Sequence, residues 1–227
     1  MTGFAMERHF TKDLPDPAAR WAGFPKHNFI GGHNDPTLIP VEGLIEATAA
    51  VLRREGPKLA MYSLGQGPQG FIGLREFVAR KSRERRGIAC TADDILITTG
   101  SGQGIDIVNR LLLSSGDTVL LEEFSYGGAI NKLKKLGVKI VGMPLDDDGI
   151  GIDALGAILA DLKAKGVAPK YIYTIPSIQN PTGSILPLDR RQALVKLSAE
   201  YGVPIFEDEC YTDLLWAGVE APPAIYS

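Results

Sequence analysis

Tyr171-Ile-Tyr-Thr-Ile-Pro-Ser-Ile-Gln-Asn-Pro-Thr-Gly183 is the stretch of sequence that decides the fold. Its first five residues, Tyr171 to Ile175, form an apolar run that is typical of a buried strand. A second apolar run, Val203 to Phe206, leads directly into the polar cluster Glu207-Asp208-Glu209-Cys210-Tyr211. Both polar clusters therefore follow strand C-terminal ends, where α/β sheets build their binding sites.

The same strand signal recurs along the chain and alternates with amphipathic helical segments. This alternation predicts an α/β fold with a mainly parallel sheet and helices on both faces. The expected strands are Ile95–Thr98, Thr118–Glu122, Lys139–Met143, Tyr171–Ile175 and Pro204–Phe206. The expected helices are Val41–Glu55, Gly70–Arg86, Gly104–Leu113, Gly127–Leu136, Ile152–Ala164 and Leu188–Tyr201.

Composition favours a cytoplasmic enzyme and excludes several other classes of protein. The 227 residues can bury a large single core, and a net charge of −3 gives no general attraction to nucleic acid or to a membrane surface. No apolar run approaches the roughly 20 residues that span a bilayer. The N-terminal residues have no signal-peptide core. Cys90 and Cys210 are isolated, so we expect neither a disulfide framework nor a metal site.

A third polar cluster, Thr98 to Gly104, is rich in glycine and serine and precedes a helix expected to begin near Gln103. The backbone N–H groups at a helix start, together with the helix dipole, form a site suited to a phosphate. A plain strand-to-helix turn would favour the same residues. Likewise, Asn180-Pro181-Thr182-Gly183 taken alone is a common turn, and Asp208 taken alone could cap a helix.

Taken together, these clusters resemble the front portion of fold-type-I pyridoxal 5′-phosphate (PLP) enzymes of the class I/II aminotransferase family. The spacing of 28 residues between Asn180 and Asp208 (208 − 180), and of three between Asp208 and Tyr211, fits the family pattern. The resemblance implies that Asp208 faces the protonated ring nitrogen of the cofactor, because this electron sink needs a carboxylate partner. It implies that Asn180 and Tyr211 donate hydrogen bonds to the phenolic oxygen of the ring.

The resemblance assigns further residues to the site. Ser101, Gly102 and Gln103 are similar to the family's phosphate-binding tripeptide, and Tyr126 matches the aromatic ring that stacks on the cofactor, although Phe124 stands where relatives more often have proline. In a homodimer, Tyr62 would reach the phosphate of the neighbouring subunit. Gly32, in the loop Phe29 to Pro36, would lie against the substrate carboxylate.

We expect an N-terminal arm at residues 1–28 and a PLP-binding large domain at residues 29–227, incomplete at its C-terminal end. The Schiff-base lysine of the family lies downstream of the Asp208–Tyr211 cluster, but the last lysine here is Lys196, in the helix before the Asp208 strand. We therefore expect that lysine, and a small C-terminal domain, beyond Ser227. The 227-residue chain alone is predicted to bind PLP weakly and to lack transaminase activity.

The function implied is transfer of an amino group from an L-amino acid to a 2-oxo acid. The motif style most resembles the branch acting on 2-aminoadipate, aromatic or other bulky amino acids. Fold-type-I lyases, decarboxylases and synthases share the same cofactor-holding residues and remain alternatives. So do a non-catalytic PLP-binding fragment and the aminotransferase-like domain of a transcription regulator, although only 28 residues precede Phe29.

Two other patterns point elsewhere, and we give them less weight. Gly65, Gly67 and Gly70 satisfy G-x-G-x-x-G, but no convincing buried strand precedes them and no acidic residue follows at the distance that dinucleotide binding requires. Cys210 could be a nucleophile, but the three histidines, His9, His27 and His33, are all far upstream in the sequence.

Overall fold

The computed structural model describes residues 5–10, 20, 23–27, 31–220 and 222–227. These residues divide into two compact units, Met1–Gly56 and Pro57–Ser227. Much of the arm expected at residues 1–28 lies outside the described residues. Within the described part of the chain, no helix is long and apolar enough to cross a membrane.

The first unit contains one long helix. Two short 3-10 helices, Met6–His9 and Pro36–Leu38, precede α1 (Val41–Glu55), which has the bounds expected from its pattern. The expected apolar face of α1 includes Leu44, Ile45 and Leu52, and all three side chains are more than half exposed. The amphipathic pattern therefore predicted the helix correctly, while the described residues of the first unit do not bury its apolar face.

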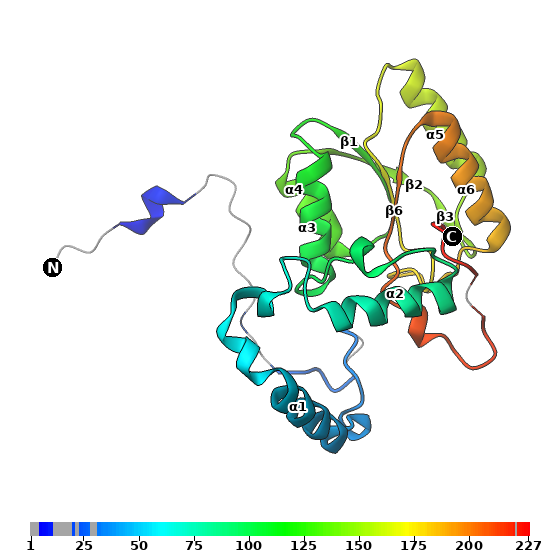
Figure 1. Ribbon diagram of the computed structural model, residues 1–227. Coiled ribbons are helices and arrows are strands. Elements are labelled where there is room, and N and C mark those ends of the chain that lie inside the picture. The colour runs from blue at the N-terminus through cyan, green and yellow to red at the C-terminus, as the bar shows by residue number, and fades with distance from the viewer. Residues whose placement is uncertain (1–4, 11–19, 21–22, 28–30, 221) are drawn as a thin grey trace. The chain divides into compact units, whose positions relative to one another are not determined.

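The second unit is built on a four-stranded parallel sheet with the strand order β2-β1-β5-β6 (Figure 1). The strands are β1 (Thr118–Glu122), β2 (Lys139–Met143), β5 (Ile172–Thr174) and β6 (Ile205–Glu207). A small antiparallel pair, β3 (Leu145–Asp146) with β4 (Gly149–Ile150), follows β2. From β1 the chain moves outward to β2 and then returns past β1 to β5 and β6. The order thus changes direction between β1 and β5, and a crevice forms at such a switch point.

Helices cover both faces of this sheet, as the alternation predicted (Figure 1). On one face α3 (Gly100–Leu112) and α4 (Gly127–Lys135) pack against Val119 and Leu121, whereas Leu120 points to the other face, toward α5 (Ile152–Ala164) and α6 (Leu188–Tyr201). Successive strand side chains alternate between faces, so the apolar residues 119–121 of β1 contribute to two separate cores, one on each face. Burial of β1 at every position follows from this arrangement.

One expected strand does not form. Residues Ile95–Thr98 are not a strand in the structure, and the N–H of Ile97 donates to the carbonyl oxygen of Gln69 instead. A strand needs a neighbour along its length, and within the described residues the sheet ends at β6. The apolar pattern was real, but sequence alone could not show that this segment has no strand beside it.

Two helix starts also differ from expectation. The helix α2 (Ile72–Arg86) begins two residues later than predicted, because Gly70 has a φ of +105° that a helix cannot contain. The helix α3 begins at Gly100 rather than near Gln103, because the Gln103 Oε1 atom accepts the N–H of Thr99 at 2.6 Å and so closes the first turn. The remaining 3-10 helices are Gly56–Ala60, Tyr62–Gly65, Ala92–Asp94 and Thr212–Leu214.

Candidate active site at the C-terminal edge of the sheet

Three of the predicted site residues follow the C-terminal ends of neighbouring parallel strands. Tyr126 follows β1, Asn180 follows β5 and Asp208 follows β6. The C-terminal ends of parallel strands share one edge of a sheet, so the topology brings the segments that carry these three residues to the same edge. That edge includes the switch point between β1 and β5, where an α/β sheet offers its crevice.

The start of α3 lies at this same edge. The hydroxyl of Tyr171, the residue just before β5, donates to the Oδ1 atom of Asn109 on α3 at 2.6 Å. From Asn109, α3 runs back eight residues (109 − 101) to Ser101, about 12 Å of helix, and the extended chain from Tyr171 to Thr174 runs about 10 Å. The expected phosphate-binding tripeptide therefore lies level with the strand ends.

The first turn of α3 suits an anion. Thr99 occupies the N-cap position without a side-chain hydrogen bond to the helix, so backbone N–H groups of the first turn are left for another acceptor. The Lys132 side chain reaches this turn from α4, with its Nζ atom 4.0 Å from the place a Cβ on Gly102 would occupy. The same Nζ pairs with the Oδ2 atom of Asp106 at 2.6 Å. Helix dipole and ammonium together favour negative charge here.

Tyr126 caps the next helix, and its ring lies over the backbone of Gly128. A Cβ added to Gly128 would lie only 2.4 Å from the Tyr126 Cζ atom, so this ring position requires glycine. The Tyr126 side chain is 37% exposed, which leaves a ring face open to a bound molecule. By comparison Phe124, the other aromatic after β1, is 59% exposed.

A buried amide and carboxylate fix the loop that carries Asn180. The Gln179 Nε2 atom donates to Glu122 Oε2 at 2.9 Å and to the Phe124 carbonyl oxygen at 2.6 Å, while its Oε1 accepts from the backbone and hydroxyl of Thr182. Glu122 is 2% exposed, and burial raises the pKa of its carboxyl despite the donors that face it. The Asn180 Nδ2 atom then lies 3.5 Å from the Tyr211 hydroxyl oxygen. Asn180 and Tyr211, predicted as a pair of donors, are thus brought together.

Asp208 is half-buried at the end of β6. Its N–H donates to the Thr174 carbonyl oxygen at 2.9 Å, which extends the ladder between β5 and β6, and its Oδ2 accepts from the Tyr173 hydroxyl at 2.6 Å. Burial and the charge of Asp208 raise the pKa of the neighbouring Cys210 thiol to about 11, which disfavours the thiolate at neutral pH. This result argues against the cysteine-nucleophile alternative.

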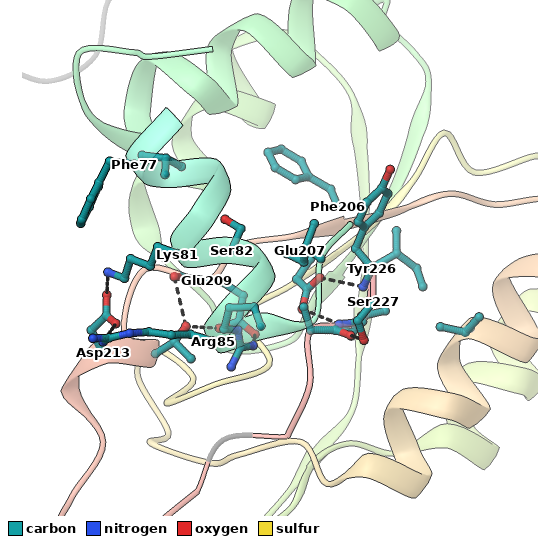
Figure 2. A pocket seen from close by; sticks show the side chains of 18 residues that line it. Phe77, Lys81, Ser82, Arg85, Phe206, Glu207, Glu209, Asp213, Tyr226 and Ser227 are labelled. Carbon is teal, nitrogen blue, oxygen red and sulfur yellow. Dashed lines mark hydrogen bonds and ion pairs between the residues drawn. The ribbon is translucent and has the colours of Figure 1, made fainter. Parts of the chain in front are cut away.

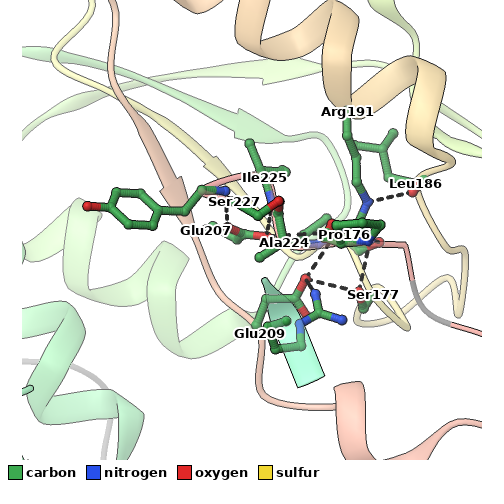
Figure 3. A network of polar contacts seen from close by, with 12 residues as sticks. Pro176, Ser177, Leu186, Arg191, Glu207, Glu209, Ala224, Ile225 and Ser227 are labelled. Carbon is green, nitrogen blue, oxygen red and sulfur yellow. Dashed lines mark hydrogen bonds and ion pairs between the residues drawn. The ribbon is translucent and has the colours of Figure 1, made fainter. Parts of the chain in front are cut away.

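A buried guanidinium supports the backbone on both sides of these residues (Figure 3). Arg191 on α6 is 2% exposed and donates to the carbonyl oxygens of Leu186 and Pro176, at 2.8 and 2.9 Å, and to the Ser177 hydroxyl at 2.9 Å. It also approaches Glu209 at 3.3 Å. One side chain therefore ties the segment before Asn180 to the residue after Asp208.

A large cavity lies elsewhere, between α2 and β6 (Figure 2). It has a volume of about 860 Å³ and is lined by side chains that include Phe77, Lys81, Glu207 and Tyr226, but by none of the predicted cofactor residues. This position matches the edge of β6 that has no further strand beside it in the described residues. We therefore interpret the cavity as a groove along the free edge of the sheet rather than as the active site.

Two other predicted residues belong to neither the strands of the sheet nor the segments that follow them. Tyr62 lies in a 3-10 helix and its side chain is fully exposed. Gly32 belongs to the other unit, with a φ of +55° and open space where a Cβ would be. The G-x-G-x-x-G segment follows 3-10 helices rather than a strand, which removes the context that dinucleotide binding needs. Among the described residues, no group of acidic, cysteine or histidine side chains could hold a metal ion.

Residues 32–226 match the family model for aminotransferase class I and II. The chain belongs to this family. Among its relatives, the aromatic-amino-acid aminotransferase 1 of Thermococcus litoralis is 34% identical over 86% of this chain and 46% of its own length. An uncharacterized HTH-type transcriptional regulator of Bacillus subtilis is 31% identical over 85% of this chain and 37% of its own length.

Solved structures agree with the family assignment. The alpha-aminoadipate aminotransferase of Thermus thermophilus, crystallised with N-(5′-phosphopyridoxyl)-L-leucine, matches with a TM-score of 0.74 and 36% identity, over 86% of this chain and 46% of that one. The chain thus spans about half the length of these aminotransferases. Its second unit has the parallel α/β architecture of their large domain.

Sequence reasoning missed three residues that shape this candidate site. Glu122 and Gln179 hold the Asn180 loop, and Tyr173 contacts Asp208 directly. Each carried a faint signal in the sequence. Glu122 is an acidic residue that ends a buried strand, Gln179 directly precedes the motif asparagine, and Tyr173 is a phenol within an apolar strand, where a hydroxyl group needs a partner.

Proposed function

We propose that this protein is the front half of a PLP-dependent aminotransferase that transfers an amino group from an L-amino acid to a 2-oxo acid. The observation that carries the proposal is the placement of Tyr126, Asn180 and Asp208 after three neighbouring strands, at the edge where α3 begins. The family match gives that arrangement its chemical meaning.

The residues of the site fit the parts of the cofactor. The phosphate would bind the first turn of α3 at Ser101, Gly102 and Gln103, where the backbone N–H groups have no side-chain cap. The ring would lie against Tyr126, held in place over Gly128, and offset stacking of two rings adds about 0.5–1.5 kcal/mol beyond the burial of area.

Polar groups at the strand ends would then orient the ring. Asp208 would accept a hydrogen bond from the protonated ring nitrogen, and Asn180 with Tyr211 would donate to the phenolic oxygen, as their 3.5 Å approach permits. When bound, PLP supplies an electron sink for the substrate α-carbon. The role of the chain is to keep the ring nitrogen protonated, because only the protonated ring is an effective sink.

The remaining parts of the proposal concern residues outside this arrangement. Lys196, on the exposed surface of α6, is not placed to bind the cofactor covalently, so we propose that the lysine that does so lies in sequence beyond Ser227. Tyr62, which is fully exposed, would contact the phosphate of a second subunit, and Gly32 the substrate carboxylate. The homodimer and the cytoplasmic location remain predictions from the sequence.

The names of the relatives favour 2-aminoadipate or an aromatic amino acid as the amino donor. The similarity to a transcription regulator keeps one alternative open, in which the same fold serves as a sensing domain. An aminotransferase and a sensing domain of this fold would both bind PLP, but only the aminotransferase would convert substrate to product.

The experiment is to express the full-length gene, add PLP, and supply 2-aminoadipate or phenylalanine with 2-oxoglutarate. The proposal predicts that glutamate forms and that Asp208→Asn reduces its rate by orders of magnitude. PLP binding without glutamate formation from any donor would contradict the enzyme assignment and favour a sensing domain. The 227-residue chain provides the control, because we expect it to bind cofactor without turnover.

A further inference from the structure

Tyr173, to which the family pattern assigned no role, contacts Asp208 directly. The Tyr173 hydroxyl donates to the Asp208 Oδ2 atom at 2.6 Å, and the Tyr173 side chain is 1% exposed. Tyr173 lies on β5, one strand away, opposite Phe206 in the register of β6. The hydroxyl group therefore comes from the rigid centre of the sheet rather than from a mobile loop.

The ring of Tyr173 is held on the face of the sheet by aromatic packing. The Phe206 ring meets Tyr173 edge-on at 5.5 Å and 88°, and meets Tyr171 at 5.7 Å and 81°. Such edge-to-face contacts are the geometry that aromatic pairs prefer. Two phenols, Tyr173 on β5 and Tyr171 just before it, thus flank one phenyl ring, and each ends in a 2.6 Å hydrogen bond, one to Asp208 and the other to Asn109.

Charges around Tyr173 keep its proton on the phenol. Burial, and then the negative charge of Asp208, raise the pKa of Tyr173 far above its ordinary value, with Glu122 and Cys210 acting in the same direction. Glu122 does not compete for this proton, because its oxygens accept from Thr174, Ile175 and Gln179. The phenol is therefore the donor of this hydrogen bond, and the Asp208 Oδ2 atom is its acceptor.

We propose that Tyr173 is a positioning residue that fixes the Asp208 carboxylate and keeps the shared proton on the ring nitrogen of the cofactor. Because the phenol holds Oδ2, the Asp208 carboxylate keeps one orientation at the end of β6. The phenol also stabilises the carboxylate anion, so the proton rests on the ring nitrogen and not on Asp208. The inference rests on the proposed cofactor site and assigns a specific role to Tyr173, which acts through Asp208 and does not itself contact the cofactor.

The test compares Tyr173→Phe with the matched control Tyr171→Phe. Each variant removes one buried phenolic hydroxyl group and one 2.6 Å hydrogen bond from neighbouring positions of the same segment, but only Tyr173 contacts Asp208. The probe is 4′-deoxypyridoxine 5′-phosphate labelled with ¹⁵N in the ring, which keeps the phosphate and the ring nitrogen but has no aldehyde to react with lysines. Its affinity for the chain and its ¹⁵N chemical shift are both measured.

For Tyr173→Phe we expect the affinity to fall by about ten- to a hundredfold, the range for a hydrogen bond to a charged group. We expect its ¹⁵N resonance to move toward that of an unprotonated pyridine. For Tyr171→Phe both readouts should stay close to those of the unmodified chain. Equal changes in the two variants, or no change in Tyr173→Phe, would overturn the positioning role.

Two further outcomes are distinguishable. If the unmodified chain does not bind the probe, the proposed cofactor site fails and this inference fails with it. If Tyr173→Phe does not fold, ¹³Cζ labelling of tyrosine in the unmodified chain replaces it. The Tyr173 resonance must then shift on saturation with the probe while that of Tyr171 does not, and an unmoved Tyr173 resonance would refute the proposal.

Discussion

Replacing Arg191 by methionine should cost the protein much of its stability. Methionine keeps the aliphatic stem but removes the guanidinium, which donates to two carbonyl oxygens within 2.9 Å and to the Ser177 hydroxyl. Breaking a buried charged pair by removing one partner costs about 3–5 kcal/mol. Glu209 would retain Arg86 at 2.8 Å, so the lower end of that range applies. A loss of about 3 kcal/mol is a large part of the 5–15 kcal/mol typical of domains.

The assay is urea unfolding followed by circular dichroism. With a slope of about 2–3 kcal/mol per M, the midpoint of Arg191→Met should fall by about 1–1.5 M. Arg191→Lys keeps a charge but loses the fork of donors, so its urea midpoint should lie between those of Arg191→Met and the unmodified chain. The neighbouring Arg190→Met is the control. Arg190 pairs with the exposed carboxylate of Asp146, so this substitution should change the midpoint little. Equal midpoints for the Arg190 and Arg191 variants would refute the reasoning.

Three other predictions concern the site. Gly128→Ala should push the Tyr126 ring aside and weaken binding of 4′-deoxypyridoxine 5′-phosphate several-fold, whereas Gly127→Ala, which meets open space, should not. Burial raises the folded-state pKa of Glu122 above its ordinary 4.5, so the Glu122 carboxylate binds a proton at a higher pH in the folded chain than in the unfolded chain. The stability of the unmodified chain relative to Glu122→Gln should therefore rise as the pH falls from that raised pKa toward 4.5, as measured by urea unfolding at each pH. Because the pKa of Cys210 is raised to about 11, alkylation of its thiol by iodoacetamide should be slow at pH 7 and accelerate up to about pH 11, followed by mass spectrometry of the peptide.

Each of these has a contradicting result. Equal binding by the two glycine variants would show that the Tyr126 ring does not contact the cofactor. A pH-independent difference between Glu122→Gln and the unmodified chain would mean that burial does not govern this carboxyl. Rapid alkylation of Cys210 at pH 7 would show that its thiolate is already present at that pH and would contradict the raised pKa.

The fold was predictable wherever local pattern and tertiary environment agree. The β1 strand and the α5 helix have their expected bounds, because an apolar run and helical periodicity coincide with burial there. The segment 95–98 has an equally good strand pattern and fails, because pairing depends on a neighbour that sequence alone cannot locate. Local pattern also could not show that the apolar face of α1 would stay exposed.

The site was predictable to the extent that its residues occupy recognisable motifs. Asn180 and Tyr211 were expected to act together, and the structure places them 3.5 Å apart. The residues behind them were not predicted, because Tyr173, Glu122 and Arg191 act through contacts between segments far apart in the sequence. A tyrosine in a strand or an arginine in a helix looks the same in sequence whether it is exposed or forms the centre of a buried network.

The most direct test of the central claim is a crystal structure of this chain with pyridoxamine 5′-phosphate. We predict the phosphate at the N–H groups of Ser101 to Gln103, the ring against Tyr126 and the ring nitrogen facing Asp208. Binding elsewhere, for example in the 860 Å³ cavity between α2 and β6, would contradict the account.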